Sequence, residues 1–234
     1  MEILVDYDNL GSERARDGLF ALCSRIAGSM GPSRDLAPVR CRVRLYGGWY
    51  DSDRFTRNAQ RLSAEIDKTF PDAIRWTAKN GSGQCTTQVE MAFSLDADPT
   101  RHLFHTLRFR RFGAVLKCDT QVFDACAELY CPMRHVADFL EEQRCPGNGC
   151  TVRQNDVLQK WEQKLVDTML VSDLIFLATR GERDLVVVSS DDDIWPGIRT
   201  ALQLGARVTQ VHTGGRETPA DYTRGVNDFW QVSL

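Results

Sequence analysis

The apolar residues of this chain follow two patterns along most of its length. Consecutive or alternating apolar residues are typical of strands, and longer stretches with apolar residues every three or four positions are typical of helices. Strands are predicted at residues 2–7, 39–48, 73–78, 184–190 and 206–213. Helices are predicted at residues 10–27, 53–70, 155–180 and 192–204. Further extended segments are predicted at residues 86–95, 112–117 and 227–234.

This alternation of strands and helices indicates an α/β fold. The strand at 184–190 is almost wholly apolar, as expected of a parallel strand that helices cover on both faces. Residues 118–153 are irregular and rich in Cys, Pro and Gly, so they are predicted to form a small insertion. We therefore expect residues 1–234 to form one domain with a central parallel sheet, helices on both faces and a Cys-rich insertion at 118–153.

Aspartates follow two of the predicted strands. Asp6 and Asp8 end the first strand, and three consecutive aspartates follow the strand at 184–190. One explanation is helix capping, in which Ser190 or Asp191 caps the next helix and the helix dipole favours the carboxylates after it. Capping explains only one or two of the three. Because ligands bind at the carboxyl ends of strands in such sheets, we expect both groups of aspartates to face one site.

The predicted helix at 155–180 contributes a further carboxylate, Asp167. It is followed by apolar residues at i+3, i+4 and i+7, which places it on an apolar stripe. A carboxylate there is costly unless it binds a cation or pairs with a group such as Lys164, one turn earlier. Mg²⁺ or Mn²⁺, which prefer oxygen ligands, would neutralise such a cluster and activate water for phosphodiester cleavage. The predicted cluster consists of Asp6, Asp167, Asp191 and Asp193.

Three blocks of this sequence resemble the signature blocks of the NYN domain, a branch of the PIN-like nucleases. They are "VDYDNL", "KLVD" and "VVVSSDDDIWPGIRTALQLGARV", and the similarity spans residues 2–13 and about 160–212. The resemblance implies a PIN-like (Rossmannoid) fold and a metal-dependent endoribonuclease, either an RNA-processing enzyme, a toxin or a defence effector. It implies metal ligands and catalytic residues at Asp6, Asp167, Asp191 and Asp193. The residues expected to lie next to the metal ligands without binding the ion themselves are Asp8, Asn9, Lys164, Ser189, Ser190 and Asp192.

The chain departs from the family pattern at three positions. Ser190 stands where a glycine is usual, Ile194 where an aromatic residue is common, and Leu165 where a glycine often precedes the Val-Asp pair. Two other functions also fit the pattern. A non-catalytic RNA-binding or recruitment module would keep the fold without needing the carboxylates. A haloacid-dehalogenase-like phosphatase would use Asp6 as nucleophile and Asp8 as general acid.

The predicted insertion contains candidate zinc ligands. Cys131 and His135 are separated by three residues, and Cys145 and Cys150 by four, with a helix-length spacer between the two pairs. Such pairs suit a tetrahedral structural Zn²⁺ site, and metal structures a small insertion more easily than a core of its own does. Cys118 or Cys126 would be close enough to replace one ligand. Ordinary reduced thiols and a helix-capping His are the alternative.

The net charge of −3 argues against a simple electrostatic coat for nucleic acid. Local clusters of arginine still suggest a path for RNA. The segment at 101–112 interleaves arginines with Phe104, Phe109 and Phe112, so phosphates would contact the arginines and bases would stack nearby. The predicted RNA-binding residues are Arg108, Arg110 and Arg111. A solvated arginine face is the alternative.

Other features of the sequence indicate where in the cell the protein is expected. No run of 18 uncharged apolar residues is present, and the N-terminus has no basic region followed by an apolar one. The eight cysteines are expected to be reduced thiols or metal ligands. We expect a cytoplasmic protein that does not contact membranes. A homodimer or another protein partner is compatible with the sequence, although no feature specifies one.

Overall fold

The computed structural model describes residues 1–11, 17–30, 37–111, 131–163, 165–214 and 225–234. They divide into two compact units, of which the first comprises Met1–Leu107 with Gln163–Leu234 and the second comprises Arg108–Glu162. The predicted Cys-rich segment at 118–153 belongs to the second unit, although residues 118–130 lie outside the described part. None of the helices described is long and apolar enough to cross a membrane.

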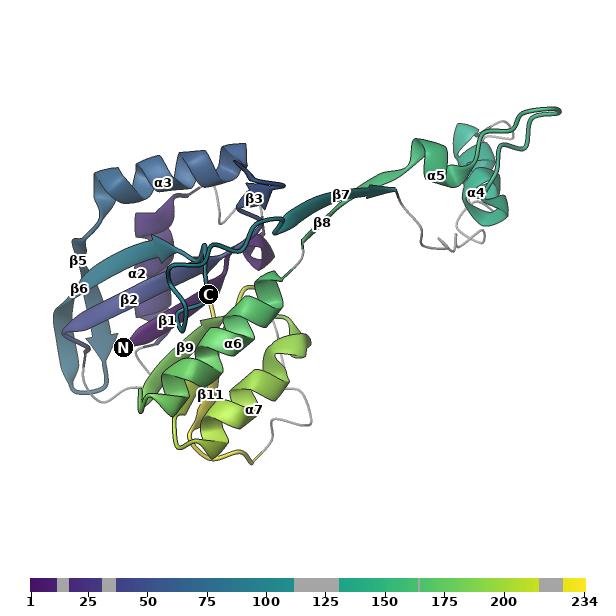
Figure 1. Ribbon diagram of the computed structural model, residues 1–234. Coiled ribbons are helices and arrows are strands. Elements are labelled where there is room, and N and C mark those ends of the chain that lie inside the picture. The colour runs from purple at the N-terminus through teal and green to yellow at the C-terminus, as the bar shows by residue number, and fades with distance from the viewer. Residues whose placement is uncertain (12–16, 31–36, 112–130, 164, 215–224) are drawn as a thin grey trace. The chain divides into compact units, whose positions relative to one another are not determined.

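A seven-stranded sheet forms the centre of the first unit (Figure 1). Its strand order is β11-β10-β9-β1-β2-β6-β5, and all neighbours are parallel except β5 and β6. The strands are β1 (Glu2–Asp6), β2 (Arg40–Tyr46), β5 (Asp72–Ala78), β6 (Gly81–Met91), β9 (Asp184–Val188), β10 (Arg207–His212) and β11 (Phe229–Ser233). The prediction of an α/β fold with a mostly parallel sheet is confirmed.

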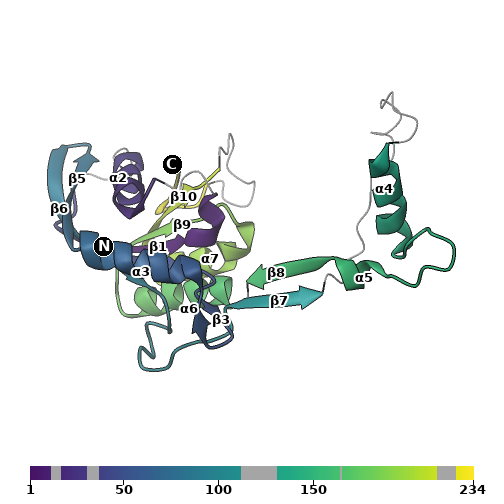
Figure 2. The same cartoon turned by 90° about the horizontal axis from the view of Figure 1, so that it is seen from above.

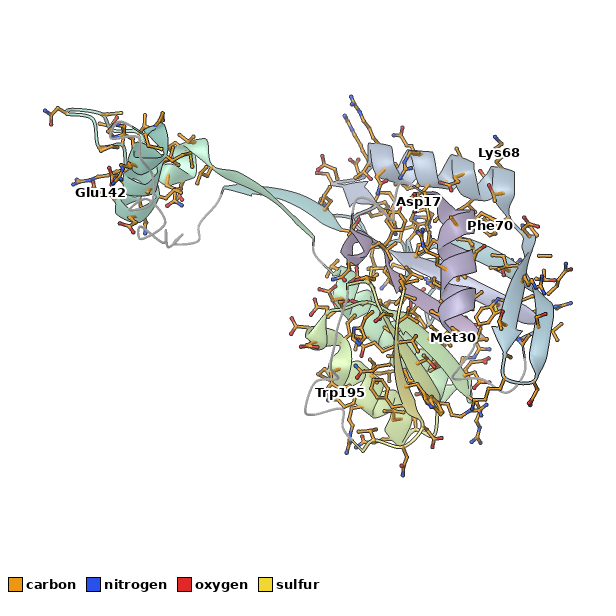
Figure 3. All side chains as sticks on the ribbon, turned by 180° about the vertical axis from the view of Figure 1, so that it is seen from behind. Asp17, Met30, Lys68, Phe70, Glu142 and Trp195 are labelled. Atoms are coloured by element: carbon orange, nitrogen blue, oxygen red, sulfur yellow. The ribbon has the colours of Figure 1, made fainter. Side chains whose placement is uncertain are left out.

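Helices cover both faces of this sheet. The helices are α2 (Leu19–Ser29), α3 (Arg57–Thr69), α6 (Val166–Thr179) and α7 (Trp195–Gln203). Ile3 and Val5 of β1 pack into the core beneath α2 and α3, whereas Leu4 packs into the core beneath α6 and α7. This explains why β1 and β9 are apolar without alternation. Figure 2 shows α2 and α6 on opposite sides of the strands, and Figure 3 shows α2 from behind, between Asp17 and Met30.

The strand order reverses between β1 and β9. The chain continues from β1 to β2 on one side and from β9 to β10 on the other. At such a switch point the connections leave in opposite directions, so the carboxyl ends of the two strands open onto a common space. Asp6 ends β1, and Ser189 directly follows β9.

A buried polar network that the sequence pattern did not predict lies between β2 and α6. The Arg44 guanidinium lies 2.9 Å from an Asp96 carboxylate oxygen, 3.1 Å from Glu90 and 3.4 Å from Asp173. Asp173, in the middle of α6, also accepts hydrogen bonds from the Tyr46 hydroxyl at 2.7 Å and the Asp96 amide at 2.7 Å. Burial, which outweighs these hydrogen bonds and the Arg44 charge, raises the pKa of Asp173. This network joins α6 to β2.

A second sheet has the strand order β4-β3-β7-β8. Its strands are β3 (Tyr50–Asp51), β4 (Arg54–Phe55), β7 (Leu107–Arg111) and β8 (Gln159–Gln163). The prediction of one helix at 155–180 is therefore wrong. That segment contains the short helix α5 (Gln154–Val157), then β8, then α6. Its apolar periodicity continues through β8, but pairing within the second sheet determines the backbone there.

The second unit contains α5 and the helix α4 (Pro132–Glu142), which begins directly after Cys131. A turn follows α4, in which the Gly147 amide donates a hydrogen bond to the Cys145 Sγ at 3.4 Å. The Cys150 amide closes the same turn on the Gly147 carbonyl at 3.0 Å.

Leu165, which precedes α6, has a backbone φ of +70° in the left-handed region. That region costs a residue with a Cβ about 1–2 kcal/mol, and a glycine pays no such cost. The Leu165 side chain is exposed, so little packing is lost on its removal. We expect Leu165→Gly to raise the free energy of unfolding by up to about 1 kcal/mol, because the greater backbone entropy of unfolded glycine offsets part of the gain. Urea denaturation measures this, with Leu204→Gly, an exposed leucine outside that region, as the control. A clear loss of stability in Leu165→Gly would contradict the argument.

Candidate functional site

Asp6 is the most buried carboxylate at the switch point. The residue is 4% exposed, and the Ser189 hydroxyl donates a hydrogen bond to its Oδ2 at 3.0 Å. The pKa of Asp6 is raised to about 7, mainly by burial and also by the nearby carboxylates of Asp167 and Asp8, while the Ser189 hydrogen bond opposes the rise. The protein groups around Asp6 therefore compensate its negative charge only in part.

The three consecutive aspartates form a turn after β9. Asp191 is the N-cap of the short 3-10 helix η4 (Asp192–Ile194), and its Oδ1 accepts a hydrogen bond from the Asp193 amide at 2.9 Å. The Asp191 amide in turn donates to the Ser189 hydroxyl at 3.1 Å. Ser189 thus connects the turn to Asp6. The predicted capping role of Asp191 is confirmed, and it leaves the second carboxylate oxygen of Asp191 outside the cap.

Asp167 lies in the first turn of α6. Its placement on a buried stripe was wrong, because the residue is exposed while Leu170 and Leu174 are buried. The fully buried carboxylate of this helix is Asp173 instead. Partial desolvation of the Asp167 carboxyl nevertheless raises its pKa, and the carboxylates of Asp191 and Asp193 raise it further. Asp167 is therefore close enough to interact electrostatically with each of the other three predicted aspartates, Asp6, Asp191 and Asp193.

A hydrogen-bond network holds the ends of the strands together. Asn9 Oδ1 accepts from the Ser190 amide at 3.2 Å and from the Thr213 hydroxyl at 2.8 Å. Ser190 Oγ accepts from the amides of Thr213 and Gly214 at 2.9 and 3.1 Å. Ser190 thus connects the β9 turn to the end of β10. Sequence reasoning missed Thr213, which could have been found because it follows the next parallel strand.

Asp8 lies in the 3-10 helix η1 (Tyr7–Leu10), directly after β1. Its Oδ2 accepts a hydrogen bond from the Gly48 amide at 2.8 Å. Gly48 follows β2, so Asp8 connects the acidic site to the loop that leads into β3. Gly48 was not among the predicted site residues. Its small size matters, because a Cβ there would lie 3.2 Å from the Leu107 side chain.

The chemistry of these carboxylates fits a hard divalent cation, which takes oxygen ligands and would supply the missing positive charge beside Asp6. The described residues nevertheless contain no three His, Cys, Asp or Glu side chains placed to hold one metal ion together. Asp167 and Asp193 are both exposed, so their side chains have room to rotate. Asp167 thus interacts electrostatically with the other three aspartates, but the four carboxylates are not positioned to coordinate one metal ion.

The candidate zinc ligands are distributed along α4 and the turn after it. Cys131 precedes the first turn of α4 and His135 lies within the helix, whereas Cys145 and Cys150 border the turn around Gly147. No three of them come together as metal ligands among the residues described. Cys118 and Cys126 lie outside that part of the chain.

Two further sets of predicted residues are only partly described. The backbone of Arg108, Arg110 and Arg111 belongs to β7, but their side chains lie outside the described part. Lys164, the predicted partner of Asp167, also lies outside it. No protein-family model, curated protein or solved structure matches the chain significantly.

The raised pKa of Asp6 predicts a pH-dependent difference in stability. The pKa of Asp6 is higher in the folded than in the unfolded protein, so the folded state binds the proton more tightly. This contribution to stability is fully present below about pH 3.8 and is lost as the pH rises through about 7. Asp6→Asn lacks the titrating group but can still accept the Ser189 hydrogen bond. In EDTA, the variant should therefore gain stability relative to wild type between pH 4 and 8. The upper limit is about 4 kcal/mol, at about 1.4 kcal/mol per pKa unit.

Urea unfolding of both proteins across this pH range measures that difference. The matched control is Asp98→Asn, because Asp98 is exposed and its ion pair with Arg101 is exposed as well. A stability difference between Asp6→Asn and wild type that stays constant from pH 4 to 8 would show that ionisation of Asp6 does not destabilise the folded protein.

Proposed function

We propose that the protein is a Mg²⁺- or Mn²⁺-dependent endoribonuclease of the NYN branch of the PIN-like fold. The observation that carries the proposal is the convergence of four aspartates from three elements at the switch point between β1 and β9. Their mutual repulsion and the burial of Asp6 make a divalent cation the natural counter-charge. The order of the three sequence blocks and the parallel sheet support the family assignment.

In this proposal Asp6, Asp167, Asp191 and Asp193 hold the ion. A divalent ion in such a site activates water and stabilises the charge that develops on the phosphodiester. Ser189 fixes the orientation of the Asp6 carboxylate through its hydroxyl. Asn9, Ser190 and Thr213 keep the two strand ends in register, so that Asp191 stays beside Asp6. Arg108, Arg110 and Arg111 are proposed to contact phosphates of the RNA.

The direct test is cleavage of a labelled RNA that contains both a stem and an unpaired loop. We expect cuts in unpaired RNA with Mg²⁺ or Mn²⁺, and none in EDTA. RNA binding without cleavage under every metal condition would favour a non-catalytic RNA-binding module. Release of phosphate from a small phosphomonoester, with the RNA left intact, would favour a haloacid-dehalogenase-like phosphatase.

We also propose a structural Zn²⁺ in the second unit, held by Cys131, His135, Cys145 and Cys150. The amide hydrogen bond to the Cys145 sulfur supports it, because such bonds stabilise a thiolate. Metal analysis of the purified protein should find about one zinc per chain. Cys145→Ser should lower that content, whereas Cys23→Ser, at a buried thiol in the first unit, should not. Protein that folds without bound zinc would rule this site out.

A further inference from the structure

Four aromatic side chains surround Tyr50 in the first unit and form a cluster with it. Tyr50 is buried, and its ring centroid lies 4.8 Å from that of Phe55, 4.9 Å from Phe104 and 5.8 Å from Phe93. His102 completes the cluster, with its Nδ1 3.1 Å from the Tyr50 hydroxyl oxygen. The rings come from three separate segments: the hairpin formed by β3 and β4, the residues after β6, and the loop before β7.

Hydrogen bonds between backbone segments hold these rings in place. The Tyr50 amide donates to the Thr106 hydroxyl at 2.9 Å, and the His105 amide donates to the Ser52 carbonyl at 2.9 Å. The Leu103 amide donates to the Phe93 carbonyl at 2.7 Å. The loop that carries Phe104 is therefore fixed to both other segments, so the rings are positioned before any ligand binds.

Two rings of this cluster are exposed. Phe55 is 41% exposed and Phe104 is 44% exposed, and both contact the buried Tyr50. Tyr50 and Phe55 are directly opposed in the hairpin, so both side chains lie on the same face of it. We call Phe55 and Phe104, supported by Tyr50, Phe93 and His102, the aromatic platform.

The aromatic platform is connected to the acidic site by a short chain of hydrogen bonds. Asp8 accepts from the Gly48 amide, and the Gly48 carbonyl accepts from the Thr56 hydroxyl at 3.3 Å. Thr56 directly follows Phe55. The hairpin that carries Tyr50 and Phe55 therefore lies at the end of the sheet where β1 and β2 have their carboxyl ends, which is also where Asp6 and Asp8 are found; Figure 1 shows β3 there.

We propose that the aromatic platform binds unpaired bases of the RNA by stacking, an inference that rests on the proposed nuclease function. Partly exposed rings that pack on other aromatic side chains, near the proposed site for phosphodiester chemistry, fit nucleobases, because every base presents a π-face. Bases in a duplex are already stacked on their neighbours and cannot use these rings. The platform thus makes the protein select single-stranded RNA, while the acidic site cuts the backbone.

The test uses the full chain with Ca²⁺ in place of Mg²⁺ to suppress cleavage. The probes are a labelled single-stranded RNA, its duplex, and a strand of the same length with abasic positions. The key variants are Phe55→Leu and Phe104→Leu, which keep an apolar side chain but remove the ring. Phe104→Trp restores a ring, and Trp230→Ala is the control, since Trp230 is a 38% exposed aromatic residue on the edge strand β11. Thermal melting confirms that each variant folds.

We expect each leucine variant to weaken binding of the single strand about tenfold, which corresponds to about 1.4 kcal/mol per stacked base. Binding of the duplex and the abasic strand should not change, and Phe104→Trp and Trp230→Ala should bind like wild type. Unchanged single-strand binding by both leucine variants, while wild type still cuts RNA, overturns the platform and leaves the nuclease proposal standing. A wild-type protein that neither binds nor cuts RNA overturns both.

A protein partner is the other possible occupant of an exposed aromatic surface. Leucine retains most of the apolar area that such a partner would cover, so the leucine variants distinguish base stacking from apolar docking. Sedimentation of wild type and of a Phe55→Ala, Phe104→Ala double variant tests self-association. Loss of a dimer in the double variant, with unchanged RNA binding, would show that the surface is a protein interface and that the inference is wrong.

Discussion

Asp6→Asn and Asp191→Asn should each lower metal-dependent cleavage of RNA roughly a hundredfold or more, as expected when a charged group that stabilises the transition state is removed. Each substitution would remove one negatively charged oxygen of the proposed metal site while nearly preserving the shape of the side chain. Asn at position 6 can still accept the hydrogen bond of Ser189, and Asn at position 191 can still cap η4. The loss should therefore appear in activity and not in folding.

Asp192→Asn is the matched control, because it changes a neighbouring carboxylate in the same turn. Consecutive side chains in a turn cannot all face one ion, so we expect Asp193→Asn to be severe and Asp192→Asn to be mild. Single-turnover cleavage at saturating Mn²⁺, with circular dichroism to check folding, measures the series. Activity of Asp191→Asn equal to that of wild type would rule out this metal site.

Asp173→Ala should lower the free energy of unfolding by about 3–5 kcal/mol, the usual cost of breaking a buried ion pair from one side. The variant leaves the Tyr46 hydroxyl and the Asp96 amide without the carboxylate oxygens to which they donate. It also removes one of the carboxylates around the buried Arg44 guanidinium. Each of these groups is buried or half-buried, so water replaces the lost partner poorly.

Urea denaturation of Asp173→Ala against Asp98→Ala separates this effect from the simple loss of a surface charge. Asp98 forms an exposed ion pair with Arg101 at 4.0 Å, and such pairs contribute little. We expect a change below about 0.5 kcal/mol for the control. A cost below about 1 kcal/mol for Asp173→Ala would mean that Arg44 keeps its network through Asp96 and Glu90 alone.

Hydrophobic patterning was sufficient to predict an α/β fold with a mostly parallel central sheet. The strands β1 and β9 are buried on both faces, and their uninterrupted apolar sequence is a direct consequence. The residues at the strand ends could be predicted for the same reason, because parallel strands bring their carboxyl ends to one edge. Asp6, Ser189 and Asp191 do lie together there.

Helix periodicity placed the buried carboxylate of α6 at the wrong position. Asp167 and Asp173 both lie beside apolar residues in the sequence, but only Asp173 faces β2, where Arg44 is available to pair with it. The alternating arginines of β2 carried a signal for this pairing, because a central strand covered on both faces cannot leave Arg44 in water. Identifying the partner required knowing which helix covers that face.

The sequence by itself determined the α/β fold, the burial of its central strands and the position of the aspartates at their ends, because all three follow from local patterns of apolar and polar residues. Only the tertiary structure revealed the strand β8 in place of a continuous helix, the Arg44–Asp173 pair and the aromatic platform. Each of these joins residues from segments far apart in the chain. Such contacts depend on which surfaces pack together, and no local pattern encodes that choice.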